Sequence, residues 1–132
     1  MCMVDDGDGW AVCSETRPRA RKATRCDECL RDITVGETYQ RIEGRTNGYT
    51  EWTTHRMCAH CRAAAQWLVK VCDGYPLRAV LADLDEHASE YNDNWLTRQV
   101  ANMRAKWRDE SGRMMPLPEL PSDLSMFGAR VA

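Results

Sequence analysis

Apolar residues recur at helical spacing in three consecutive stretches of the second half of the chain. The first stretch begins near Ala59 and ends at Asp73-Gly74, a dipeptide that suits a C-terminal stop. Pro76 can open the second, in which leucine and valine recur at i, i+3, i+4 and i+7. The sequence "NDN" at residues 92–94 can cap the third. The pattern therefore predicts three helices.

A different pattern precedes the helices. The segments "ITVGETYQRIE" and "YTEWTT" are rich in β-branched and aromatic residues, and they flank "GRTNG". The Asn47-Gly48 dipeptide suits a turn with positive φ, so we expect a β-hairpin whose register the untidy alternation leaves open. Residues 1–24 have no sustained periodicity and are expected to form an irregular arm. The predicted fold class is α+β.

One compact domain is expected, because 132 residues with 43% hydrophobic content suffice for one modest core. Residues 25–110 would form this domain, and the irregular basic arm of residues 1–24 would precede it. Residues 111–132 are expected to form an extended tail, since three prolines fall close together near its start. The tail carries spaced apolar residues that it cannot easily bury unaided.

The charges are unevenly distributed, although the formal net charge of −2 argues against a wholly cationic nucleic-acid binder. Residues 17–25, "RPRARKATR", carry five cations and no acid, whereas residues 73–93 carry six acids and one cation. Cations at this density can contact phosphates. The predicted nucleic-acid contacts are Arg17, Arg19, Arg21, Lys22, Arg25 and Arg45, and Arg31, Arg41 and Arg56 could extend them.

Signals for secretion or membrane insertion are not evident. The N-terminal sequence has no apolar signal core, and the most apolar run, "AAAQWLVKVC", is too short to span a bilayer. The number of cysteines, seven, is odd. We therefore expect a cytoplasmic protein with no membrane segment, in which Cys2 and Cys13 are free thiols and Cys72 packs as a small hydrophobic residue.

Four cysteines form two chelating pairs, Cys26-x2-Cys29 and Cys58-x2-Cys61, separated by 28 residues. This number and pairing of thiolates predicts one closed tetrahedral zinc site. Two such knuckles, the intervening hairpin and a helix that begins at the second pair would make a treble clef, followed by a helical C-terminal half. Because four protein ligands leave no open coordination position, the single zinc ion would be structural.

Other interpretations of these cysteines remain open. A thioredoxin-like redox pair would need only one such motif, in a βαβ context. His55 is an alternative ligand, because Trp52-x2-His55-x2-Cys58 with the first pair resembles the Cys-Cys-His-Cys zinc finger of poly(ADP-ribose) polymerases. His60, between Cys58 and Cys61, is expected to be exposed or to support the ligands from outside the coordination sphere.

The segments "ARKATRCDECLRDITVGETYQRIEG", "HRMCAHCRAAAQWLVKVCDGY" and "LADLDEH" resemble small zinc-finger proteins encoded by bacteriophages and prophages. The shared pattern is a basic lead-in, a first knuckle, an Ile-x-x-Gly-Glu-x-Tyr hairpin, a second knuckle and then helices. The resemblance covers about residues 20–87. It implies a zinc-stabilised fold with Cys26, Cys29, Cys58 and Cys61 as ligands, and no activity that can be carried over.

Three classes of function remain. An enzyme is the least favoured, because the chain has no Gly-rich phosphate loop, no evident small-molecule substrate and no Asp-His pair of the kind that HNH nucleases carry beside their zinc knuckles. A phage accessory module that binds a host or phage protein is favoured, and nucleic-acid binding through the basic arm is the alternative. Because extended proline-containing segments lose little entropy on docking, the third helix and the tail are the predicted partner surface. Its residues are Trp95, Met103, Trp107, Leu117, Leu120, Leu124 and Phe127.

Overall fold

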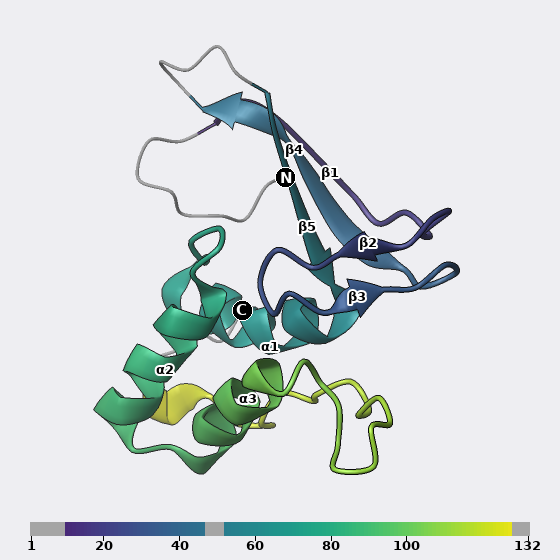
Figure 1. Cartoon of the computed structure of the whole chain (residues 1–132). Coiled ribbons are helices and arrows are strands. Elements are labelled where there is room, and N and C mark those ends of the chain that lie inside the picture. The colour runs from purple at the N-terminus through teal and green to yellow at the C-terminus, as the bar shows by residue number, and fades with distance from the viewer. Residues whose placement is uncertain (1–9, 47–51, 128–132) are drawn as a thin grey trace.

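The computed structural model of the chain describes residues 10–46 and 52–127, so the predicted turn at Asn47-Gly48 lies outside the described residues. Its main sheet has three antiparallel strands in the order β1-β4-β5 (Figure 1). These strands are β1 (Trp10–Thr16), β4 (Tyr39–Thr46) and β5 (Thr53–Cys58). The two strands of the predicted hairpin are β4 and β5, and the register runs from Tyr39 opposite Cys58 to Gly44 opposite Thr53.

The strand β1 corrects the expectation that the N-terminal segment is an irregular arm. It pairs with β4 from Trp10 opposite Thr46 to Thr16 opposite Arg41, with one irregularity near its start. Beyond the strand, Arg19 forms an isolated bridge with Thr38. The segment has little periodicity of its own, and what orders it is the hydrogen-bonding edge of β4, which is distant in the sequence.

A separate two-stranded sheet holds the first cysteine pair. It consists of β2 (Thr24–Arg25) and β3 (Asp32–Ile33), and the turn between them carries Cys26 and Cys29. Cys26 and Leu30 close this turn: the N–H of Leu30 donates to the carbonyl of Cys26 at 3.1 Å. Leu30 adopts a φ of 67°, a left-handed conformation that non-glycine residues seldom adopt.

Three helices follow, as predicted: α1 (Ala59–Cys72), α2 (Val80–Tyr91) and α3 (Asn94–Arg104), with a short 3-10 turn, η1 (Ser125–Phe127), near the end. Asp73 ends α1 with a φ of 63°, and Asp93 caps α3 by accepting the N–H of Leu96 at 2.9 Å. The second helix begins at Val80 rather than at Pro76, and its N-cap residue Ala79 has no side-chain cap. No helix in the described ranges is long and apolar enough to cross a membrane.

The helix α1 lies between the sheet and the two later helices (Figure 1). The core forms around it, with Trp67, Leu68 and Trp107 among its largest buried side chains. The C-terminal segment returns to this core instead of extending away from it. The N–H of Met115 donates to the carbonyl of Trp107 at 2.7 Å. Further on, the ring of Phe127 packs edge-on against Trp67, with the ring centroids 5.2 Å apart.

This packing corrects part of the predicted partner surface. Met103 is 0% exposed, Trp107 is 1% exposed and Phe127 is 6% exposed, so these three side chains belong to the core. Their spacing fits an apolar face equally well whether that face meets a partner or the rest of the chain, and here the chain itself covers it. The partly buried residues Trp95, Leu120 and Leu124 pack against the same core, whereas Leu117 is 53% exposed.

Candidate metal centre

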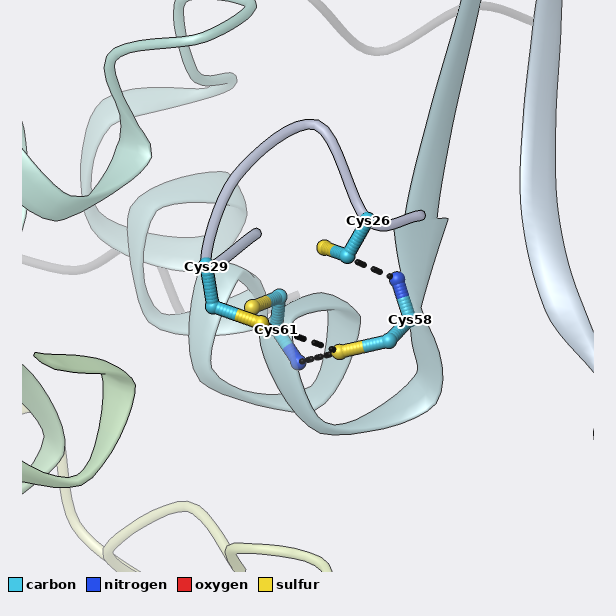
Figure 2. Close-up of side chains that lie close together, drawn as sticks. All are labelled: Cys26, Cys29, Cys58 and Cys61. Atoms are coloured by element: carbon cyan, nitrogen blue, oxygen red, sulfur yellow. Dashed lines mark hydrogen bonds between the residues drawn. The ribbon is translucent and has the colours of Figure 1, made fainter. Parts of the chain in front are cut away.

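Four buried cysteine side chains meet between the β2–β3 turn and the start of α1 (Figure 2). Their Sγ atoms all lie within 4.8 Å of one another, and they are the only such cluster of metal-ligating side chains among the described residues. The Sγ atoms of Cys29 and Cys58 are 3.9 Å apart. Two sulfurs bound tetrahedrally to one zinc ion, with Zn–S bonds of about 2.3 Å, would be about 3.8 Å apart. The structure therefore brings the predicted ligands Cys26, Cys29, Cys58 and Cys61 together in an arrangement that suits one metal ion.

Hydrogen-bond donors point at the sulfur atoms. Cys26 Sγ accepts the backbone N–H groups of Glu28 at 3.4 Å and Cys58 at 3.3 Å. Cys58, the N-cap of α1, accepts the N–H of Cys61 at 3.4 Å, and the indole N–H of Trp107 donates to Cys61 Sγ at 3.3 Å. Such donors stabilise negative charge on sulfur, as does the N-terminal end of a helix. The sequence pattern does not reveal the contact of Trp107 with a ligand, because the two residues are far apart in the chain.

The thiols of this cluster cannot all ionise without a cation. Hydrogen bonding from Cys29, and then from Cys58 and Cys61, holds the pKa of Cys26 far below its usual range. Hydrogen bonding to Cys26, and then to Cys29 and Cys58, raises the pKa of Cys61 far above its usual range. The four sulfurs share protons in this way because four adjacent negative charges would repel one another. A divalent cation removes that repulsion, which is the electrostatic reason for such a cluster to bind metal.

His55 lies outside the cluster and has a different role from the alternative ligand that the sequence suggests. Its Nε2 atom is 2.6 Å from Oε2 of Glu28, and the two side chains are 0% and 1% exposed. The same carboxylate accepts the backbone N–H groups of Arg78 at 2.7 Å and Val80 at 3.1 Å. Glu28 thus provides the cap that Ala79 lacks, and the His55–Glu28 pair links the first cysteine pair to the start of α2.

His60 connects the metal site to the C-terminal segment and is buried rather than exposed. Its Nε2 atom lies 2.6 Å from the carbonyl oxygen of Met115, so Nε2 carries a proton and donates it. Nδ1 then accepts a hydrogen bond at 3.3 Å from Arg31, which is itself paired with Glu37 at 2.9 Å. Burial, opposed by the bond to Met115, lowers the pKa of His60.

Glu37 holds Arg31 in place from the β3–β4 connection. Burial raises the pKa of this carboxyl, but the hydrogen bonds from Arg31 and from Thr34 outweigh burial and lower the pKa to about 2. The carboxylate is therefore charged at neutral pH. Arg31 is only 3% exposed, so water cannot hydrate its guanidinium group. The ion pair with Glu37 supplies the stabilisation that hydration would otherwise give.

Two of the three remaining cysteines, Cys13 and Cys72, differ from expectation. Cys13 is disulfide-bonded rather than free, and Cys2 lies outside the described residues. Cys72 is exposed instead of packing in the apolar stripe.

Cys72 also lies beside His87, a pairing that the sequence pattern does not predict because the two residues lie on different helices. Cys72 Sγ is 3.4 Å from Nε2 of His87, and Nδ1 of His87 is 2.8 Å from the carbonyl oxygen of Asp83. Burial, followed by the charges of Asp83, Asp73 and Glu90, raises the pKa of the Cys72 thiol. The C-terminal end of α1 disfavours a thiolate as well. This pair therefore does not have the activated thiolate that nucleophilic catalysis requires.

The predicted nucleic-acid contacts lie on several surfaces rather than on one arm. The largest group lines a hollow of about 390 Å³, whose walls contain no acidic side chain. We call it the cationic hollow, and its charged residues are Arg19, Arg21, Lys22, Arg41 and Arg56. Arg25 lines a neighbouring hollow with Arg31, Lys106 and Arg108, Arg17 lines a third pocket with Arg62, and Arg45 is exposed on β4.

A comparison of this chain with protein-family models, curated proteins and solved structures finds no match.

Proposed function

We propose that the four cysteines bind one zinc ion, that the zinc is structural, and that the two pairs, the β4–β5 strands and α1 form a treble clef. The support is the ligand set, because four buried sulfurs fill a tetrahedral coordination sphere and leave no position for water or substrate. The order of the elements also agrees, since the first pair lies in the β2–β3 turn and the second spans the end of β5 and the start of α1. Such a module acts by binding rather than by catalysis.

The proposed binding activity is recognition of the nucleic-acid phosphate backbone through the cationic hollow. The observation that carries this proposal is the composition of the hollow, which has five cationic side chains and no acidic one in its walls. Phosphate contacts of this kind supply most of the affinity of sequence-independent nucleic-acid binding. Tyr39, the aromatic residue in the hollow, is 8% exposed, so contact with the backbone is favoured over stacking on bases.

The strand register brings like charges together in the cationic hollow, which destabilises the protein in the absence of a bound anion. Arg41 on β4 lies directly opposite Arg56 on β5. Like charges at opposed positions of an antiparallel pair are destabilising. Arg41 has one carboxylate near it, that of Glu43 at 3.3 Å, whereas Arg21, Lys22 and Arg56 form no ion pair within the described parts of the chain. A bound polyanion would neutralise this surface.

A second cationic surface can extend the contact. Thr24 lines the cationic hollow, and the next residue of β2, Arg25, lines the neighbouring hollow of about 210 Å³ with Lys106, Arg108 and one acid, Asp32. Successive residues of a strand point to opposite faces, so β2 separates two adjacent cationic surfaces. The resemblance to phage and prophage zinc-finger proteins supports placing this activity in the cytoplasm of a bacterial host cell.

The test is the salt dependence of binding to a short duplex DNA of mixed sequence, followed by fluorescence anisotropy. If the five cations of the hollow each neutralise one phosphate, the slope of log affinity against log salt is about −4.5. Replacing Arg21, Lys22 and Arg56 together with glutamine should bring this slope about 2.7 closer to zero. The control is Arg98→Gln, an exposed position on α3 that should leave the slope unchanged. Absence of binding at low salt, or equal slopes for the triple variant and wild type, would contradict the proposal.

Protein binding is the second candidate function, and its support is the exposure of two apolar side chains on the C-terminal segment. Leu117 is 53% exposed and Met126 is 73% exposed. Met103, Trp107 and Phe127 of the predicted partner surface are buried, so fewer exposed residues support this candidate than the sequence pattern implies. A pull-down from bacterial lysate after nuclease treatment, with Leu117→Asp as the variant, tests it. A partner retained equally by both proteins would exclude this surface.

A further inference from the structure

A pocket of about 430 Å³ lies between the sheet edge and α1. Its walls come from the end of β1, from β4, from one face of α1 and from the connection after α1; we call it the sheet–helix pocket. Gln40 lies in its wall, whereas the flanking β4 residues Tyr39 and Arg41 line the cationic hollow. Because adjacent residues of a strand point to opposite faces, the two sites lie on opposite faces of the sheet. The volume falls within the range of about 300 to 1,000 Å³ that is typical of small-ligand sites.

Two guanidinium groups line the pocket, and no carboxylate of residues 10–46 or 52–127 lies at ion-pair distance from either. Arg62, on α1, forms no ion pair or hydrogen bond with the described residues, and its Nε atom is buried. Arg17 lines the same pocket, so two like charges face one cavity while both guanidiniums remain ionised. A buried N–H without an acceptor is costly, and two like charges in one pocket add to that cost. A bound anion would relieve both.

Neutral donors complete the lining. The hydroxyl oxygen of Tyr75, a residue 2% exposed, accepts a hydrogen bond from Nε2 of Gln40 at 2.9 Å. The hydroxyl hydrogen of Tyr75 is not used in that bond and is available to an acceptor. Burial is the main reason that the pKa of Tyr75 is raised to about 12, so the hydroxyl keeps its hydrogen at neutral pH. Gln66 adds a side-chain amide from the same face of α1 as Arg62.

We propose that the sheet–helix pocket binds the phosphate group of a small phosphorylated ligand, with Arg17 and Arg62 as its charge partners and Tyr75 as a neutral donor. A phosphate is favoured over a carboxylate, because the donors of two guanidiniums, a hydroxyl and an amide exceed what two carboxylate oxygens can accept. Glu15 also lines the pocket, and its carboxylate opposes the binding of an anion. The negative charge of Glu15 therefore lowers the affinity for phosphate, and removing this charge should raise the affinity.

The test uses inorganic phosphate and adenosine 5′-monophosphate as probes, titrated by calorimetry into the metal-loaded full chain. Arg62→Gln should weaken binding of both probes by about tenfold or more, because one charge-assisted hydrogen-bonding group is lost. Arg62→Lys should retain part of the affinity, and Glu15→Gln should strengthen binding severalfold. Arg98→Gln is the matched control and should bind like the wild type. Metal content and circular dichroism must be unchanged in each variant, since Arg62 follows the ligand Cys61.

Several outcomes would overturn the proposal: no binding of either probe, equal affinities for Arg62→Gln and Arg98→Gln, weaker binding by Glu15→Gln, or tighter binding of succinate than of phosphate. A competition experiment identifies the source of the phosphate. Displacement by adenosine 5′-monophosphate, but not by a duplex lacking terminal phosphates, identifies a free phosphate monoester, whereas displacement by the duplex identifies the nucleic-acid backbone. The inference is independent of the cationic hollow, because Arg56→Gln should weaken duplex binding and leave phosphate binding unchanged.

Discussion

Replacing His55 with leucine tests whether this histidine is a metal ligand or a buried structural residue. Leucine has a similar volume but no hydrogen-bond donor, so Glu28 would lose one partner while the backbone N–H groups of Arg78 and Val80 remain. The cluster of four cysteines does not include His55, so the variant should still bind one metal ion per chain. Its stability should nevertheless fall, because the Glu28 carboxylate is only 1% exposed and cannot be hydrated.

The expected loss follows from the burial of the pair. A hydrogen bond to a charged group contributes about 1.5 to 3 kcal/mol, and a buried polar group that loses its partner costs about 1 to 3 kcal/mol, or more when it is charged. Glu28 is fully buried but keeps two backbone donors, so we expect a loss at the upper end of the hydrogen-bond range, about 3 kcal/mol. With an unfolding entropy of about 2.1 cal/mol/K per residue, this loss lowers the midpoint of thermal unfolding of the 132-residue chain by about 10 °C.

The assay combines metal content by mass spectrometry with thermal and denaturant unfolding at neutral pH. His55→Gln should recover part of the loss, because its amide can donate to Glu28. The control is His87→Leu, a histidine that is 18% exposed and pairs with a backbone carbonyl instead of a buried carboxylate, so its replacement should cost about 1 kcal/mol. The reasoning is refuted if His55→Leu loses its metal, and in particular if excess zinc restores its stability, because His55 would then be a ligand.

Three further predictions concern the metal, the tail and acid stability. Cys29→Ser should lose most of its metal and much of its helical circular dichroism, as should the chelated wild type, whereas Cys72→Ser should keep both; a metal-loaded Cys29→Ser would contradict the assigned ligand set. Phe127→Ala should lower the free energy of unfolding by about 3 to 5 kcal/mol, whereas the exposed Met126→Ala should change it by about 0.5 kcal/mol or less; equal effects would show that the tail is not part of the core. Glu37→Gln should be less stable than the wild type above about pH 4.5, because the folded pKa is lowered to about 2, and this difference should shrink as the pH falls toward 2; a difference independent of pH would exclude the ion pair as its cause.

Much of the local structure can be predicted from the sequence, because its determinants lie within a few residues of one another. The two cysteine pairs predict the cluster of four cysteines, since a Cys-x-x-Cys turn by itself directs two sulfurs toward one ion. Asp73 and Asp93 mark helix ends by conformational and hydrogen-bonding preferences that act within one turn. The apolar periodicity of the three helices is equally local.

The contacts on which the proposed functions depend join residues that are distant in the sequence, so only the tertiary structure reveals them. The strand β1 has a weak pattern of its own and is ordered by β4, while Phe127 is buried by α1 and α2 instead of by a partner. The buried pair of His55 with Glu28 has the same origin. The Arg17–Arg62 pocket likewise requires the end of β1 and a face of α1 to meet. A residue's type and spacing limit which bonds it can form, but packing of the whole chain decides which atoms it meets and whether water can reach them.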